Sequence, residues 1–448
     1  MHLAVASFAA ALLLVPIGGG SGYTVATPGP RFFMASPSRF SLWNECERDK
    51  LVPQKHGQAL WFFERLESHR WRVETPEEAD LVVVPALIDW YSRGLCEGGR
   101  GYAAHVANVT DTVLATSGAA SRNTTHLLIA ADWTSQSWSH KPVPAGLRIG
   151  RNVAKAIRDT LAKRGVRTVV GTYLNVWKRG SWAPQSCHFG IGFLANLDHT
   201  LMGLAKDVHG AVANEARKNA GCSDYHRTRL APDVTRARPF TIEFMGQVTN
   251  KKKDRGDDQP GYPDRWALFH SGHKLPNGSI LITNTAEAES ELPRCSSIAG
   301  KELADLGTQL HYCTTPEITR ACGQEIRALA TYSLYLAGDD PGGDRLFNAL
   351  AALQIPIMVG GDEAGGRSWL PFPAVVDWAN ITLAVARSAF RKNPAAAVAQ
   401  AVAEGEGQME GIRRRIVAYL PDFMWHVLGS RVHENILLEA AACGQRCT

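Results

Sequence analysis

Short apolar runs alternate with amphipathic stretches along the chain from about residue 31 onward. The stretch "ADLVVVPAL" (79–87) is continuous and rich in valine, which is typical of a strand buried on both faces. Two further strands are predicted at "THLLIAADW" (125–133) and "RTVVGTYL" (167–174), and "VAKAIRDTLAKRG" (153–165) predicts an amphipathic helix between them. Strand, helix and strand at short spacing predict a parallel sheet covered by helices.

The same alternation returns in the second half of the chain, after a stretch from Lys178 to Gly192 that is predicted to be loop-rich. Strands are predicted at "FTIEFMG" (240–246), "TYSLYLAG" (331–338) and "IPIMVGG" (355–361). The second half therefore predicts another parallel sheet with helices.

Two units of similar size are expected because 448 residues exceed what one core usually serves. The polar, proline-marked segment "APDVTRARP" (231–239) is the expected linker. A helical region is expected from Glu404 through Leu438, broken at Pro421. The predicted fold class is α/β, with two facing Rossmann-like domains. The expected divisions are an N-terminal segment at 1–22, a first domain at 28–235, a second domain at 236–420, and a C-terminal helix and tail at 421–448.

The segment "GDDPGGDRLFNALAALQIPIMVGGD" places an acidic, glycine-rich loop between a predicted strand and an apolar helix. Ligands of open α/β sheets bind where strands lead into such loops. Gly342 and Gly343 have no side chains, so a ligand can approach the backbone closely. The amides of these residues and of Asp344 lie at the positive end of the helix dipole and suit a phosphate. Arg345 can add a two-pronged hydrogen bond, and Asn348 can bond a ribose hydroxyl.

Two other interpretations of this loop stay open. Arg345 can simply pair with Asp344 or Asp340 in a connecting loop. Alternatively, Asp339 and Asp340 can hold a divalent cation together with substrate phosphates.

The charge balance argues against a nucleic-acid partner. Lys and Arg number 48 against 43 Asp and Glu, so the net charge is only +5. The single dense basic run, Lys251–Lys253, is followed at once by aspartates and is typical of a solvated loop.

The N-terminal segment predicts entry into the secretory pathway. An apolar run from Leu3 to Ile17 ends in glycines, a length typical of a signal peptide or short signal anchor, although the usual positive n-region is missing and only His2 stands there. The alternative is a buried N-terminal helix. Any membrane contact is expected through this segment alone. Sequons for N-glycosylation agree with secretion and begin at Asn108, Asn123, Asn277 and Asn380.

Nine cysteines fit an oxidising compartment, in which several are expected to form disulfides. Cys313 with Cys322 and Cys443 with Cys447 are close enough in sequence to pair, although spacing alone does not fix the connectivity.

Several motifs, in order, give the chain a resemblance to the exostosin-like glycosyltransferases. The Arg-Leu-Phe helix with its Ile-Pro strand, at 338–362, resembles the second domain of that family. "TPEEADLVVVPAL" (75–87), "HLLIAADW" (126–133) and "RPFTIEFMGQV" (238–248) are similar to family strands in the same order.

The resemblance implies an inverting transferase of GT-B architecture that takes a nucleotide-diphosphate sugar, commonly a UDP-sugar, and needs no metal in the chemistry. Arg345 matches the family's arginine at the diphosphate. The chain departs from the family at Gly342 and Gly343, where serines are usual, at Asn348, where an acidic residue is common, and at Gln354, where cysteine is common. These departures keep open an alternative, a catalytically weakened carbohydrate-binding or scaffold protein.

Inversion requires a base that removes the proton of the acceptor hydroxyl. Asp132, at a predicted strand end of the first domain, is the candidate, although it can equally cap a turn. Arg265 is a candidate for a donor phosphate or for a surface ion pair. Acceptor sugars are expected to stack on some of the loop tryptophans, which are Trp133, Trp138, Trp177 and Trp182.

Overall fold

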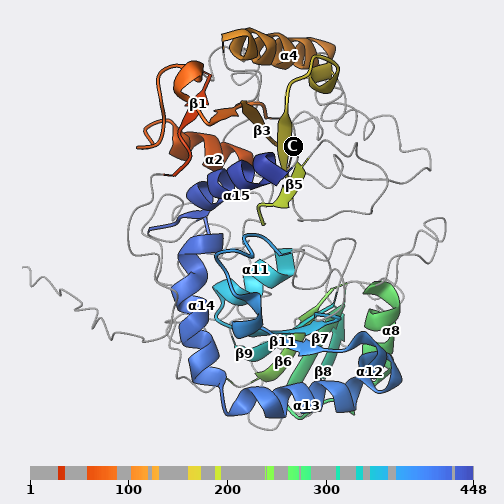
Figure 1. Ribbon diagram of the computed structural model, residues 1–448. Coiled ribbons are helices and arrows are strands. Elements are labelled where there is room, and N and C mark those ends of the chain that lie inside the picture. Colours follow the sequence, from red (N-terminus) through yellow and green to blue (C-terminus); the bar gives the residue numbers. More distant parts are fainter. Residues whose placement is uncertain are drawn as a thin grey trace, which may run out of the picture.

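The computed structural model contains two parallel β-sheets, one in each half of the chain (Figure 1). The residues that it describes are 29–35, 58–87, 102–119, 124–130, 160–172, 187–192, 238, 240–246, 261–271, 274–283, 309–312, 329–336, 344–361, 370–425 and 429–446. The predicted N-terminal segment 1–22 lies outside these residues. Among those described, no helix is both long and apolar enough to cross a membrane.

The first sheet follows the order of the chain, β1-β2-β3-β4-β5, and every neighbouring pair is parallel. β5 lies inside the stretch that the sequence predicted to be loop-rich, so that prediction was wrong there. A four-residue edge strand with the sequence Cys-His-Phe-Gly carries no alternation long enough to be recognised. The strands are β1 (Phe32–Met34), β2 (Leu81–Val83), β3 (Thr125–Ile129), β4 (Thr168–Thr172) and β5 (Cys187–Gly190).

Helices cover both faces of the first sheet. Leu127 and Ile129 of β3 point into the main core, which they share with helix α2 (Gln58–Leu66) and helix α15 (Val432–Arg446). The alternate residue Leu128 points into a second cluster, with helix α4 (Tyr102–Ala119). Burial on both faces explains why these strands read as continuous apolar runs in the sequence.

The second sheet has the order β11-β10-β9-β6-β7-β8, again with parallel neighbours. The chain begins at the centre of the sheet with β6, builds outward through β7 and β8, then returns to the centre at β9 and builds the other way. This is the Rossmann order, with its reversal between β6 and β9. The strands are β6 (Phe240–Met245), β7 (Ser279–Thr283), β8 (Gln309–Tyr312), β9 (Ala330–Tyr335), β10 (Ile355–Val359) and β11 (Leu383–Val385).

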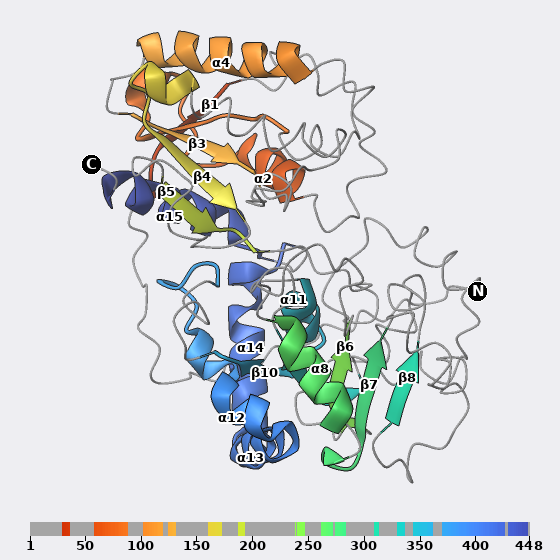
Figure 2. The same cartoon turned by 90° about the vertical axis from the view of Figure 1, so that its right-hand side faces the viewer.

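The two domains face each other through the carboxyl ends of their strands (Figure 2). Gln58 of α2 donates from Nε2 to the carbonyl of Gly192, just after β5, at 3.3 Å. A Cβ built on Gly192 would lie 2.9 Å from the ring of Phe347 in the second domain. The predicted α/β class with two facing Rossmann-like domains is confirmed.

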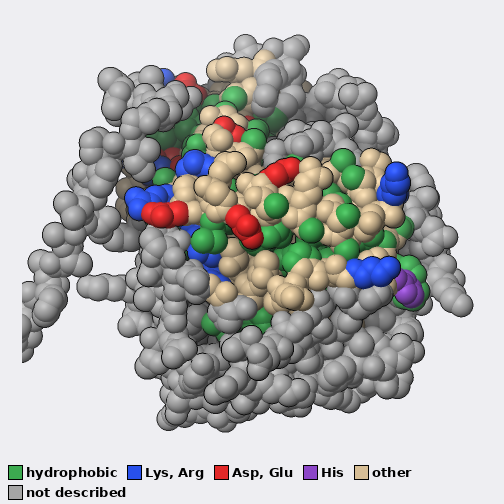
Figure 3. Space-filling model, turned by 90° about the horizontal axis from the view of Figure 1, so that it is seen from below, with side chains coloured by type: hydrophobic (Ala, Val, Ile, Leu, Met, Phe, Trp, Pro, Cys, Tyr) green, Lys and Arg blue, Asp and Glu red, His purple; other side chains and the backbone are tan. Residues whose placement is uncertain are grey.

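Helices α12 and α13 form the underside of the second domain, where Lys and Arg side chains stand in separate groups between small hydrophobic areas (Figure 3). Their junction follows local sequence rules, because Asn393 accepts from the amide of Ala396 at 3.1 Å and Pro394 occupies the first helical position. The remaining helical elements are the 3-10 turns η3 (Pro76–Glu78) and η12 (Trp378–Asn380), and the helices α8 (Gly261–Ser271), α11 (Asp344–Ala351), α12 (Arg387–Lys392), α13 (Pro394–Glu406) and α14 (Met409–Phe423).

The predicted break of the C-terminal helical region at Pro421 is wrong by a few residues. Pro421 lies inside the last turn of α14, and the chain turns only after Phe423. The turn is held by Asp422, whose two carboxylate oxygens accept from Arg431 at 2.9 and 2.7 Å. Helix α15 then returns to the first domain and packs on β4 and β5. Proline removes one backbone hydrogen bond near the end of α14, while the ion pair between Asp422 and Arg431 sets the position of the corner.

Close packing of α15 on the first sheet gives a prediction about Gly444. A Cβ at Gly444 would lie 2.6 Å from Oγ1 of Thr125, a short buried side chain that has no room to move. We expect Gly444→Val to lower the unfolding free energy by about 1–3 kcal/mol, as overpacking in a core does. The matched control is Gly411→Val in α14, where only the flexible tip of Arg415 comes within 4 Å. Equal melting temperatures for the two variants would contradict this packing.

Candidate functional site

The described residues that meet at the reversal of the second sheet centre on Arg345. It is the second residue of α11, the helix that follows β9, and its side chain is half-buried. Its Nη1 donates to the carbonyl of Met245, the last residue of β6, at 3.2 Å. The guanidinium therefore spans the carboxyl ends of β6 and β9, where open α/β sheets bind their ligands.

Gly246 makes room for that guanidinium. A Cβ at Gly246 would overlap Nη1 of Arg345, so a side chain there would push the arginine away from Met245. The sequence prediction identified Arg345 but missed Gly246. A glycine directly after a buried strand is the signal that marks such a close approach.

Helix α11 is anchored so that its first turn is fixed. Leu346, Phe347 and Leu350 are fully buried. At the other end, Leu353 adopts a left-handed φ of 53°. The amide of Leu353 donates to the carbonyl of Leu350, and the amide of Gln354 donates to the carbonyl of Ala349. This is a Schellman ending with leucine in place of glycine, and burial of the leucine side chain offsets the backbone strain.

Asn348 lies three residues after Arg345 on the same helix face and is buried, with 1% exposure. Phe347, between them, contacts Gly192 of the first domain. The carboxyl end of β5 therefore reaches the helix that carries Arg345. A bond from Asn348 to a ribose stays a prediction.

A buried carboxylate lies two residues before the end of β6. Glu243 is 3% exposed, and its Oε1 accepts from the hydroxyl of Ser333 at 2.7 Å. The two residues are in register on β6 and β9. The pair joins the strands on either side of the reversal through a short, buried hydrogen bond.

Arg265 lies in a different setting from the one expected. The "YPD" sequence forms the first turn of helix α8 rather than a separate turn, and Arg265 is 2% exposed, so a surface ion pair is excluded. The adjacent Asp264 is also buried and accepts from Arg387 at 3.0 Å and from Arg391 at 2.6 Å. These pairs fasten α8 to α12. Contact between Arg265 and a donor phosphate stays a prediction.

Several predicted residues lie outside the described part of the chain. Asp344 begins α11, although its side chain is not described, and the other residues are not described at all. Their roles therefore stay predictions. They are Asp132 as base, Gly342 and Gly343 at the phosphate, Asp339 and Asp340 as metal ligands, Asn123, and Trp133, Trp138, Trp177 and Trp182.

The other three sequon asparagines lie at different depths. Asn277 is exposed in the turn before β7, and Asn380 is exposed in η12. Asn108 is half-buried within α4. Turn positions suit a bulky sugar better than a helix face that packs on the sheet.

No protein-family model matches the chain, and no curated protein matches its sequence. Among solved structures, WaaG, a glycosyltransferase involved in lipopolysaccharide biosynthesis, gives a TM-score of 0.36 at 10% identity, covering 91% of this chain and 98% of that chain. The pneumococcal O-GlcNAc transferase GtfA in complex with UDP and GlcNAc gives 0.32 at 11% identity, covering 76% and 60%. HepE from Anabaena in complex with UDP gives 0.28 at 11% identity, covering 93% and 94%. None of the three reaches a TM-score of 0.5, so the fold rests on the strand order of the chain itself.

Burial of His126 gives a prediction about pH. His126 lies in β3 with 1% exposure and donates from Nδ1 to the carbonyl of Thr124 at 3.2 Å. Burial lowers the pKa of His126 from 6.5 to about 4. The folded chain therefore keeps the ring neutral, while the unfolded chain takes up a proton below pH 6.5. Stability should fall as the pH drops from 6.5 to 4, by up to about 3 kcal/mol from this residue.

Melting temperatures measured across this pH range test the assignment. His126→Gln should flatten the acid slope, whatever its effect on stability at neutral pH. His270→Gln, at an exposed position on α8, serves as the control and should keep the slope of the parent protein. An unchanged slope in His126→Gln would refute the assignment.

Proposed function

We propose that the chain is an inverting glycosyltransferase of GT-B architecture that moves a sugar from a nucleotide-diphosphate sugar, a UDP-sugar in our proposal, to a glycan or glycoprotein acceptor. The observation that carries the proposal is the position of Arg345 across the carboxyl ends of β6 and β9. A cation at the reversal of a Rossmann sheet, at the start of a helix, suits a diphosphate.

The chemistry assigns separate tasks to the two domains. Charge gathers on the leaving diphosphate, and Arg345 with the amides of Gly342, Gly343 and Asp344 would stabilise it. Cations are disfavoured at a helix N-terminus, so a bound anion would relieve the cost of Arg345 at this position. Asp132 of the first domain would remove the proton from the acceptor hydroxyl.

The donor nucleoside would lie on the same face of α11, where Asn348 would bond its ribose, and Arg265 would complete the phosphate side. Basic groups and helix amides would take the place of a metal in the transfer, which requires no cofactor besides the donor. Asn348 in place of a carboxylate would weaken the ribose bond without removing it.

We further propose that the protein works in the secretory pathway, in the Golgi lumen. The apolar N-terminal run and the exposed asparagines at 277 and 380 support this assignment. Cys443, buried in α15, is disulfide-bonded, which also supports an oxidising compartment.

The first test removes the guanidinium of Arg345. Arg345→Ala should weaken UDP binding by about 10- to 100-fold, the loss expected for hydrogen bonds to a charged group. Release of UDP from a panel of UDP-sugars should fall further, because the charge on the leaving group is greatest in the transition state. Calorimetry measures the binding and a coupled assay measures the release.

Arg414→Ala is the matched control, because Arg414 is exposed on α14 and pairs only with Glu410 among the described residues. It should keep the affinity and the rate of the parent protein. Full UDP binding and turnover in Arg345→Ala would remove the proposed donor site. Binding of UDP by the parent protein with no turnover of any donor would favour the carbohydrate-binding alternative.

A second test moves Arg345 without replacing it. Gly246→Ala should displace the guanidinium, because the main overlap is with the flexible tip of Arg345, while the buried ring of Phe244, 3.2 Å from the new Cβ, must shift slightly. We expect about tenfold weaker UDP binding, equivalent to about one charged hydrogen bond. In the double variant with Arg345→Ala, the glycine change should add no further loss. Additive losses in the double variant would show that Gly246 acts independently of Arg345.

A further inference from the structure

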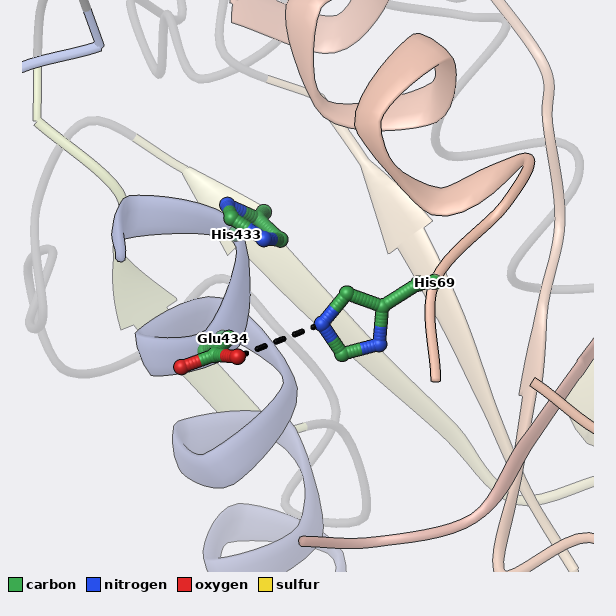
Figure 4. Close-up of side chains that lie close together, drawn as sticks. All are labelled: His69, His433 and Glu434. Carbon is green, nitrogen blue, oxygen red and sulfur yellow. Dashed lines mark hydrogen bonds and ion pairs between the residues drawn. The ribbon is translucent and has the colours of Figure 1, made fainter. Parts of the chain in front are cut away.

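A cluster of three possible metal ligands lies where α15 meets the first domain, on elements other than those that carry Arg345 (Figure 4). His69 follows α2, and His433 and Glu434 are the second and third residues of α15. One ligand atom from each lies within 4.8 Å of the others. The side chain of His69 is 8% exposed and that of Glu434 is 19% exposed. The rings of His69 and His433 meet edge to face, with centroids 5.2 Å apart.

His433 is the incomplete member of this cluster. Its Nδ1 is buried and has no hydrogen-bond partner among the described residues. An imidazole nitrogen that is buried without a hydrogen-bond partner is costly to leave unsatisfied, and a metal ion would satisfy it.

We propose that His69, His433 and Glu434 bind a transition-metal cation of the Zn²⁺ class. Two imidazoles and one carboxylate form a ligand set that suits zinc and its neighbours. Ca²⁺ and Mg²⁺ prefer oxygen ligands, so they are not expected at this cluster. The three side chains must move slightly toward one another to bind the ion, because the ligand atoms of one small cation lie less than 4.8 Å apart.

The cluster as it stands uses only part of its bonding capacity. Oε1 of Glu434 accepts from Nε2 of His69 at 3.3 Å and from Arg70 at 3.2 Å. Its Oε2 receives no hydrogen bond from the described residues, so it is available to a cation. The positive charges of Arg65 and Arg70 and the N-terminal end of α15 oppose a cation there. Imidazole bonding must therefore supply most of the affinity.

The proton of His69 must move when the ion binds. The amide of Trp71 donates to Nδ1 of His69 at 3.2 Å, so the neutral ring carries its proton on Nε2. Coordination through Nε2 shifts that proton to Nδ1 and gives up the bond from Trp71. One neutral hydrogen bond is a small loss beside the free energy of binding transition metals in proteins.

The position of the cluster implies a structural role. His69 belongs to the first domain, while His433 and Glu434 begin the helix that returns from the second. A bound ion would fasten α15 to the first domain at the point where the chain crosses over. It would add stability without taking part in transfer of the sugar.

The test measures Zn²⁺ binding to the full chain after treatment with EDTA and removal of the chelator. The parent protein should bind one equivalent of Zn²⁺ more than His433→Ala and one more than Glu434→Gln, measured by competition with a chromophoric chelator. Zn²⁺ should raise the melting temperature of the parent protein by several degrees more than that of either variant.

Glu434→Gln removes the carboxylate ligand but keeps an oxygen that accepts from His69. A loss of Zn²⁺ binding in this variant therefore reports the missing ligand and not a loss of folding. Its circular dichroism in EDTA should match that of the parent protein. His270→Ala, an exposed histidine on α8, is the control and should bind as many equivalents as the parent protein. Equal stoichiometry in the parent protein and both ligand variants would overturn the proposal. UDP binding is expected to be the same in Glu434→Gln and the parent protein, so this outcome is independent of the donor site.

Discussion

The hydrogen bond from Arg345 to the end of β6 is the interaction on which the candidate site depends. It joins the helix after β9 to the last residue of β6, and these strands lie on the two sides of the reversal in strand order. The loops after two such strands leave in opposite directions, so the sheet edge opens between them. In the first sheet the strands follow chain order, and it contains no such reversal among its described strands. The second domain is therefore the one whose described strands have the order at which α/β sheets typically bind ligands.

Buried acidic side chains that have hydrogen-bond or ion-pair partners connect the elements around the site. Glu243 binds Ser333 across the central strands, Asp264 binds two arginines of α12, and Asp422 binds Arg431 at the corner before α15. An unpaired carboxylate at such depth would be costly, so each pair fixes the relative positions of the elements that it joins. Arg345 differs from these because its described contact is a single backbone carbonyl, which leaves most of its donors for a ligand.

Helix α15 connects the second domain to the first. It follows α14 along the chain and packs on the first sheet, where Gly444 allows contact with Thr125 at close range. The bond from Arg65 to the carbonyl of Trp425, at 2.6 Å, lies at the same crossing. The His69–His433–Glu434 cluster is at this point as well, so a metal there would act on the joint between the domains rather than on the chemistry.

The sequence alone determined the α/β class, six of the eleven described strands, and the helix that carries Arg345, because buried parallel strands and amphipathic helices leave local patterns. It did not identify β1, β5, β7, β8 and β11, most of which are edge strands of three or four residues. It also placed the C-terminal break at Pro421, because a local breaker residue does not decide where a helix ends when tertiary contacts hold it. Only the tertiary structure decided the strand order, the use of Gly246 as space for Arg345, and the meeting of His69 with His433. Each of these depends on residues far apart in the chain, and no pattern of neighbouring residues records which distant segments will pack together.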